Sequence, residues 1–422
     1  MKIIVKNVTI IDAASAHHEK KENVLIENGF IKKIGTAIDE AGATVVDGKD
    51  GFISPGWCDM RAHFNEPGYE HKEDLESGMN SAMAGGFTAV AITPDTQPVL
   101  HSKAEIEFVK SKTKSHIVDV LPYGAITHNL DGLNLAEMFD MKNSGAVAFT
   151  DGNNTIANAG VMLRALLYVK NFDSFIVAHA DDINISNKGK MNEGITSVML
   201  GMKSIPAIAE EIIISRDIEL LRYTESRIHF SHISTQGSVA LIAKAKADGL
   251  NVTCDVAIAN LIYDDSILME FETNYKVNPP LRTRADIDAL IAGVNDGTID
   301  AIVSDHRPQN DENKDVEFDI AANGMNNLQT FYNLLLKLEG RIAWDKLVAA
   351  ISRHPRRILG LPMASVAEGC EANFTVFNPN ITWDYNASSN RSLAKNSPLY
   401  NTTLQGKIIA IGNKNKLAVM NS

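Results

Sequence analysis

The sequence is poor in cysteine and in positive charge, and both shortages exclude classes of protein. Its 422 residues contain three cysteines, Cys58, Cys254 and Cys370, and none belongs to a Cys-x-x-Cys pair. This spacing disfavours a zinc ribbon or a dithiol redox motif, so we expect buried, free thiols. The formal net charge is −12 and no basic stripe is present. A nucleic-acid partner is therefore excluded, because such a surface needs clustered Lys and Arg.

Long hydrophobic runs are missing as well. The longest apolar stretches have the length of a strand, and the opening Met1-Lys2-Ile3-Ile4-Val5 is too short for a signal peptide or a membrane helix. We therefore expect a cytoplasmic protein without a membrane partner. Hydrophobic residues make up 45% of the chain and charged residues 22%, which predicts a folded protein with a large core.

Both ends of the chain are rich in β-branched residues and turn dipeptides. Asn28-Gly29 is typical of a hairpin turn between two short strands. We predict that residues 1–54 and 360–422 together form one small β-sandwich, and that residues 55–359 form the main domain. The predicted strands of the sandwich are 3–11, 23–26, 30–34, 44–46, 372–377, 407–412 and 416–420.

The main domain alternates β-rich runs with helical or mixed segments. Continuous apolar runs such as 89–92 and 301–303 fit strands that are covered on both faces. Eight such units predict an α/β protein with a (β/α)8 barrel of the TIM type. The eight runs are 52–63, 88–94, 116–123, 146–151, 174–180, 227–233, 251–257 and 299–305.

Five side chains of the metal-binding type stand at the ends of these runs. They are His63, Asp151, His179, His232 and Asp305, after runs one, four, five, six and eight. A single histidine near a strand is usually a packing residue, and a single aspartate there usually caps a helix. Barrel enzymes assemble their sites from the carboxyl ends of the strands, so the five together favour a shared metal centre or its remnant.

Motifs spread over nearly the whole chain resemble those of the bacterial class I dihydroorotases, which belong to the amidohydrolase superfamily. They are GFISPGWCD (51–59), EPGYEHKED (66–74), AGGFT (84–88), VAHADD (177–182), SHIST (231–235), KVNPPLR (276–282), SDH (304–306), EG (368–369) and NSP (396–398). The resemblance implies a zinc hydrolase of pyrimidine biosynthesis, which interconverts carbamoyl aspartate and dihydroorotate. In such a site zinc lowers the pKa of a bound water to near 7.

The resemblance also implies residue roles. The family's ligand positions match His63, Asp151, His179, His232 and Asp305, and Asp305 would also be the catalytic proton shuttle. The family's Asp-x-His-x-His motif reads Asp59-Met60-Arg61-Ala62-His63 here. Arg61 has no lone pair to offer a metal, so we expect zero or one zinc per chain. Its side chain either replaces the lost cation, by pairing with Asp151 or Asp305, or turns to solvent.

Four further positions match the family's substrate-binding residues, and three of them differ in type. Asn65 stands where an Arg is usual, Asp95 where an Asn is usual, and Gln309 where a His is usual, while Asn278 retains the expected residue. An aspartate facing a substrate carboxylate is repulsive unless it is protonated or paired. The resemblance thus implies a site altered against the family's anionic substrate.

Three functions stay open. The first is a non-catalytic homologue that serves as an assembly subunit for aspartate carbamoyltransferase. The second is a one-zinc amidohydrolase acting on dihydroorotate or a less anionic cyclic amide, with Asp305 as general base. The third is a dihydroorotase that tolerates these losses. Hydantoinase and allantoinase activities are disfavoured, because residues 148–151 lack the lysine that those relatives carboxylate. The family also predicts a homodimer.

Overall fold

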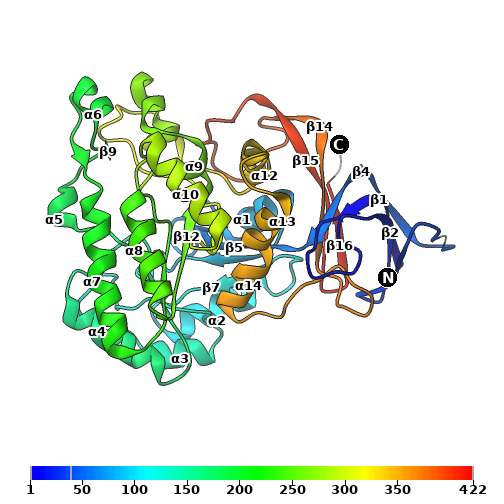
Figure 1. Ribbon diagram of the computed structural model, residues 1–422, viewed down its shortest axis with the longest axis horizontal. Helices are drawn as coiled ribbons and strands as arrows, with labels where there is room; N and C mark the ends of the chain where they lie inside the picture. The colour runs from blue at the N-terminus through cyan, green and yellow to red at the C-terminus, as the bar shows by residue number, and fades with distance from the viewer. Residues whose placement is uncertain (1, 39, 421–422) are drawn as a thin grey trace.

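The computed structural model describes residues 2–38 and 40–420. Figure 1 shows a barrel surrounded by helices, with a β module at one end that contains both ends of the chain. In the described part of the chain, no helix combines the length and the hydropathy that crossing a bilayer requires.

The β module is one hydrogen-bonded sheet of seven strands in the order β16-β15-β14-β4-β1-β2-β3. Strand β4 pairs antiparallel with β14, which joins the first 55 residues to the last 50. Asn28 and Gly29 have φ of 51° and 84°, as the predicted hairpin requires. A composite β module from both termini is thus confirmed. Its strands are β1 (Lys2–Ile10), β2 (Lys21–Glu27), β3 (Phe30–Gly35), β4 (Thr44–Pro55), β14 (Phe374–Tyr385), β15 (Thr402–Asn413) and β16 (Lys416–Val419).

The barrel has parallel strands at seven of its eight positions. They are β5 (Trp57–Ala62), β6 (Phe87–Ile92), β7 (Asp119–Pro122), β8 (Ile176–Ala178), β11 (Ile228–Phe230), β12 (Val252–Ala257) and β13 (Ala301–Val303). A bridge between Ala62 and His306 closes the ring between the first and last positions. The two short strands β9 (Met191–Asn192) and β10 (Ser204–Ile205) lie outside it.

The fourth barrel position corrects the sequence prediction, because residues 146–151 form no regular strand. Phe149 bridges to Gly124 on one side and to Ile176 on the other, and Val147 N and Thr150 N also donate to Pro122 O and Gly124 O of the third position. Just beyond it, the backbone N–H groups of Ile126 and Thr127 donate to the Asp151 carboxylate. A side chain therefore satisfies these two amides, so the backbone pairing with the third position ends before them.

Helices cover the outside of the barrel, and side chains fix where several of them begin. Asp74, Ser102 and Thr283 each form a capping box at a helix start. The helices are α1 (Leu75–Ala84), α2 (Lys103–Thr113), α3 (Met138–Asn143), α4 (Ala159–Lys170), α5 (Ile183–Ser186), α6 (Ile195–Leu200), α7 (Ile208–Thr224), α8 (Gln236–Ala247), α9 (Ile258–Ile262), α10 (Arg284–Asp296), α11 (Asp311–Lys314), α12 (Phe331–Leu335), α13 (Trp344–Val348) and α14 (His354–Leu359). The 3₁₀ helices are η1 (Asp265–Glu270), η2 (Thr273–Tyr275) and η3 (Leu336–Leu338), and η4 (Ala349–Arg353) is a π-helix.

The cysteines are free, as expected, but their burial differs. Cys58 and Cys254 are buried in barrel strands, and burial raises the pKa of the Cys58 thiol to about 12. Cys370 is only partly buried, which corrects the expectation for this residue. It lies in a turn before β14, where its carbonyl accepts a hydrogen bond from Ile31 N.

Gly56 links the β module to the first barrel strand and leaves no room for a side chain. An added Cβ would overlap Asn373 Oδ1 and Thr88 Oγ1. Arg356 donates to both of these oxygens, at 3.0 and 2.9 Å, so neither can move freely. We expect Gly56→Ala to lower the free energy of unfolding by about 2–3 kcal/mol through overpacking. Urea denaturation measures this. Gly35→Ala is the matched control, because nothing lies within 4 Å of its Cβ position; equal effects would contradict the packing argument.

Candidate functional site

The five predicted metal-type residues lie at the carboxyl ends of the barrel positions, as the sequence indicated. His63 follows β5, Asp151 follows the fourth position, His179 follows β8, His232 follows β11 and Asp305 follows β13. All five side chains are buried. His232 and Asp305 have φ of 44° and 46°, a strained left-handed conformation for residues with a Cβ. Such strain is concentrated at functional sites, so it supports this end of the barrel as the site.

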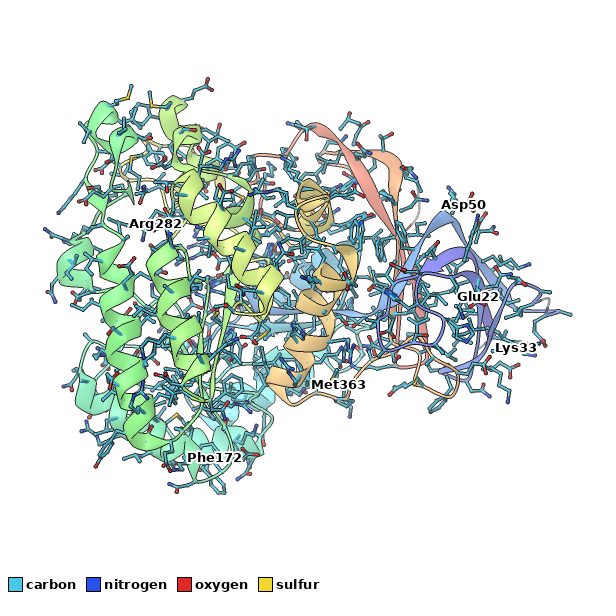
Figure 2. All side chains as sticks on the ribbon, viewed as in Figure 1. Glu22, Lys33, Asp50, Phe172, Arg282 and Met363 are labelled. Atoms are coloured by element: carbon cyan, nitrogen blue, oxygen red, sulfur yellow. The ribbon has the colours of Figure 1, made fainter. Side chains whose placement is uncertain are left out.

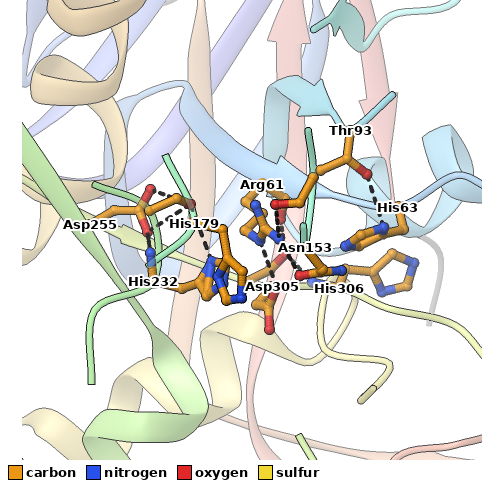
Figure 3. Close-up of polar contacts among 12 residues, drawn as sticks. Arg61, His63, Thr93, Asn153, His179, His232, Asp255, Asp305 and His306 are labelled. Atoms are coloured by element: carbon orange, nitrogen blue, oxygen red, sulfur yellow. Dashed lines mark hydrogen bonds and ion pairs between the residues drawn. The ribbon is translucent and has the colours of Figure 1, made fainter. Parts of the chain in front are cut away.

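Arg61 points into the centre of this site and is 1% exposed. Its Nε donates to Asp305 Oδ1 at 3.0 Å, and a terminal nitrogen donates to Asn153 Oδ1 at 2.5 Å (Figure 3). The sequence left three outcomes open for this side chain. In the structure the guanidinium pairs with Asp305. It pairs neither with Asp151 nor with solvent. A buried cation thus lies at the centre of the site, at the position where the sequence resemblance predicted a lost metal ligand.

The Asp151 carboxylate is turned toward the loop after β7. It accepts hydrogen bonds from Ile126 N at 2.8 Å, Thr127 N at 2.9 Å and Thr127 Oγ1 at 2.5 Å. Burial raises the pKa of Asp151 to about 6, although these three donors favour the charged form. Both carboxylate oxygens are therefore engaged by the protein itself.

His179 and His232 are bonded to each other. His232 Nε2 and His179 Nδ1 are 2.8 Å apart and share a hydrogen bond, and their stacked rings have centroids 4.8 Å apart. Burial, with Arg61 and Arg307 nearby, lowers the pKa of His179 to about 3. Burial and then Arg61 also hold the pKa of His232 well below its usual value. Both rings are thus neutral at pH 7, and His179 Nε2 is a buried nitrogen without a hydrogen-bond partner.

His63 pairs with Asp95, one of the predicted substrate-binding residues. Its Nδ1 lies 3.1 Å from Asp95 Oδ1 and 2.9 Å from Thr93 Oγ1, while its Nε2 has no partner. Burial opposes the charge on Asp95, but His63 and Arg307 beside it hold the pKa of this carboxyl well below its usual range. The negative charge at this position is therefore matched within the protein.

The other predicted substrate-binding residues do not form one cluster. Gln309 donates through Nε2 to Asn323 O at 3.0 Å, which ties its amide to the following loop. Asn65 has a buried Nδ2 without a partner and a φ of 58°. Asn278 lines a cavity of about 10 Å³ beside His179. Asn278 thus borders His179, one of the predicted metal-type residues.

Two residues of the site were missed in the sequence. Asn153, which accepts from Arg61, lies in a stretch with an ordinary turn composition. Asp255 is fully buried in β12, where it accepts from His229 Nε2 at 2.7 Å and from His232 N at 2.5 Å. An aspartate inside the apolar run Val252–Ala257 was the available signal, because a buried carboxylate needs donors around it.

The donor set does not fit a two-metal centre. Asp305 is engaged by Arg61, Asp151 by Thr127, and His179 by His232. Within residues 2–38 and 40–420, no group of three or more His, Cys, Asp or Glu side chains is arranged to hold one metal ion. The ligand assignment to His63, Asp151, His179, His232 and Asp305 stays a prediction.

Comparisons with known proteins cover essentially the whole chain. Residues 51–238 match the family described as dihydro-orotase-like. The chain is 40% identical over 417 residues to a dihydroorotase of Pelotomaculum thermopropionicum, covering 96% of both, and 39% identical over 414 residues to one of Pelobacter propionicus, covering 97% of both. An L-hydantoinase (dihydropyrimidinase) from Arthrobacter aurescens has a TM-score of 0.87 at 23% identity, covering 100% of this chain and 97% of that chain. At such identity the structural match shows the fold alone, which confirms the barrel with its β-sandwich.

Proposed function

Because the chain belongs to the dihydroorotase family, we propose that it is a member that has lost the hydrolysis of dihydroorotate and acts as a non-catalytic subunit. One observation carries the proposal, namely the buried ion pair between Arg61 and Asp305 at the centre of the site. The guanidinium supplies a positive charge where the family's first metal would be held. A guanidinium can donate hydrogen bonds to a water, but it is no Lewis acid, so it cannot coordinate a water and lower its pKa as a metal ion does.

The surrounding residues support the same proposal. Asp305, the family's proton shuttle by resemblance, has one oxygen committed to Arg61. Asp95 is ionised where the family uses a neutral amide to hold a substrate carboxylate. A carboxylate has no N–H to donate, so Asp95 cannot take the place of an amide donor that would hold the carboxylate of dihydroorotate. We propose at most one zinc per chain.

The role that remains is structural. The chain resembles the inactive dihydroorotase-like subunits that hold aspartate carbamoyltransferase in a complex, and we propose that enzyme as the partner. A pull-down with the aspartate carbamoyltransferase of the same genome tests this part separately. Co-elution at a fixed ratio is expected, and its failure would remove the partner while leaving the loss of hydrolysis standing.

Zinc content and turnover test the proposal together. The protein is purified without chelator, and zinc per chain is measured beside the ring opening of dihydroorotate, with and without added zinc. The dihydroorotase of Pelotomaculum thermopropionicum, treated identically, is the positive control. We expect turnover at least about 10³-fold below that control, because the loss of one electrostatic stabiliser alone costs about 10²–10³. Zinc-dependent turnover within tenfold of the control would overturn the proposal.

A one-zinc amidohydrolase is the second candidate, and the facing nitrogens of His179 and His232 favour it. Two neutral imidazoles are suitable zinc ligands. Because His232 Nε2 and His179 Nδ1 are only 2.8 Å apart, little movement would let both bind the same ion. This function needs Asp151 to leave its bonds with Thr127. One zinc per chain, together with chelator-sensitive hydrolysis of a neutral cyclic amide, would select this candidate over the first.

A further inference from the structure

Two histidines, His101 and His128, lie outside the central site and take part in none of its contacts. His101 belongs to the loop 93–102 after β6, and His128 belongs to the loop 123–137 after β7. Figure 2 labels one residue at each end of the barrel: Arg282, whose Nε donates to Ser234 Oγ after β11, lies at the carboxyl end, and Phe172, just before β8, lies at the other. Both histidines follow the carboxyl ends of their strands, so they lie at the same end as Arg282.

The two imidazole rings are close together. Their centroids are 5.4 Å apart with 75° between the planes, and both residues are half-buried. A zinc ion binds an imidazole nitrogen at about 2.0–2.1 Å and prefers tetrahedral angles, so two rings on one ion have centroids roughly 5 Å apart. The observed spacing therefore fits two rings that share one ion.

Each ring has a nitrogen that is free to bind. His101 Nδ1 lies 3.0 Å from Val99 O, which can only accept, so Nδ1 carries the proton and Nε2 of the neutral ring keeps its lone pair. Metal-binding histidines commonly donate their other ring N–H to a backbone carbonyl in this way. Within residues 2–38 and 40–420, neither ring nitrogen of His128 has a hydrogen-bond partner. One lone pair from each ring is thus available to a metal ion.

The backbone holds both rings in place. Ala125 N donates to Leu100 O at 2.8 Å, which fastens the two loops to each other directly beside His101. Leu100 is fully buried, so this end of its loop is anchored in the core. His128 N donates to Asn134 O at 3.1 Å, which fixes its own loop. An ion would therefore find both ligands already positioned and would spend little binding free energy on ordering them.

The ligand types indicate which ions the pair would take. Imidazole nitrogens suit zinc and copper, whereas magnesium and calcium prefer oxygen ligands. In the part of the chain that the structure describes, no third His, Cys, Asp or Glu side chain joins these two rings in a metal-binding group. Water would complete the coordination, so the site would be open and exchangeable, unlike a closed structural zinc site.

We propose that His101 and His128 bind one divalent transition-metal ion of the zinc type, which links the loops after β6 and β7. The loop of His101 also carries Asp95, and the loop of His128 carries the two amides that bind Asp151. The ion would therefore hold in place two loops that shape the central site. It is counted apart from the central site, where at most one zinc is expected, and it depends on neither the presence nor the loss of hydrolysis.

Isothermal titration calorimetry with zinc chloride tests the proposal on the full chain, stripped of metal and of any purification tag. We expect His101→Ala and His128→Ala each to weaken zinc binding at least about 10-fold, because even a change beside a ligand costs about 10–100-fold. The double variant should lose no more than either single variant, since the two rings act as one unit. His71→Ala is the matched control, because His71 is an exposed histidine outside the pair, and it should bind zinc like the wild type.

A variant of the central site separates the two locations. His179→Ala should retain the zinc binding that His101→Ala removes. With copper(II) in place of zinc, electron paramagnetic resonance of His179→Ala should show coupling to two imidazole nitrogens, a signal that packing of the two rings does not produce. The urea midpoints of metal-free His101→Ala and His128→Ala should lie close to that of the wild type, which shows that both variants fold.

Three outcomes would overturn the proposal. Zinc binding that neither His101→Ala nor His128→Ala weakens would leave the ring contact as packing alone. A wild-type chain that binds no zinc would do the same. Zinc binding lost in His179→Ala but kept in His101→Ala would assign the ion to the central site and favour the one-zinc amidohydrolase. None of these results decides whether dihydroorotate is hydrolysed, which the turnover measurement tests separately.

Discussion

Asp305→Asn is expected to lower the free energy of unfolding by about 3–5 kcal/mol, because it leaves the Arg61 guanidinium buried without a counter-charge. The asparagine keeps an oxygen that can accept from Arg61 Nε. The loss of stability therefore measures the removed negative charge, because the size of the side chain hardly changes. In a metal-dependent hydrolase, the same substitution would chiefly remove activity. Urea denaturation at pH 7 measures the effect. Asp311→Asn, an exposed carboxylate 3.4 Å from Lys395, is the matched control and should change stability by less than about 1 kcal/mol.

The double variant Arg61→Met/Asp305→Asn tests whether the two residues act as an ion pair or contribute to packing independently. Arg61→Met alone leaves Asp305, whose side chain is 11% exposed and can be partly hydrated at the barrel mouth. We therefore expect a smaller loss, of about 1–3 kcal/mol, for that single variant. Combined with Asp305→Asn, it should recover most of the stability, since no charge is then buried unpaired. Simple addition of the two losses would contradict the role assigned to the pair.

Asp255→Asn is expected to lower the free energy of unfolding by about 3 kcal/mol, because Asp255 accepts hydrogen bonds from both His229 and His232. The substitution turns one acceptor oxygen into a donor that faces existing donors, either His229 Nε2 or His232 N. His232, which already has a left-handed φ of 44°, would lose the bond that fixes its backbone. We expect the hydrogen bond between His179 and His232 to weaken as well, which nitrogen NMR of the two rings detects.

The control for this prediction is a surface carboxylate with similar partners. Asp248 accepts from Lys244 at 2.9 Å and from Arg222 at 3.0 Å, and all three side chains reach solvent. Asp248→Asn should therefore change stability by less than about 1 kcal/mol. Equal losses at positions 248 and 255 would mean that burial of the network does not set the cost.

Burial and Arg61 together determine that the two histidines of the site are uncharged. Arg61 lies close enough to His179 and His232 to help keep both rings neutral. A single guanidinium therefore acts on both halves of the site: it engages Asp305 directly and disfavours protonation of the two histidines. Arg61→Met should raise the pKa of His232 toward its ordinary value, although burial keeps the pKa below it.

The sequence by itself determined the barrel, the composite β module and the positions of the metal-type residues at the strand ends. Hydrophobic periodicity and turn dipeptides carry that information, because they act between residues close together in the chain. It also singled out Arg61, which stands at a predicted ligand position. It did not show that the fourth barrel position pairs over only a few residues around Phe149, since the end of that pairing depends on where the Asp151 carboxylate points.

Only the tertiary structure decided which groups meet in the site. Arg61 and Asp305 are 244 positions apart, and Asp255 meets His232 across 23 positions on a neighbouring strand. Each of these side chains had several acceptable partners at the barrel mouth. The choice followed from which strand ends converge and from the need to give the buried guanidinium and carboxylates partners. That need is a property of the folded interior, where water is not available to take the place of a partner.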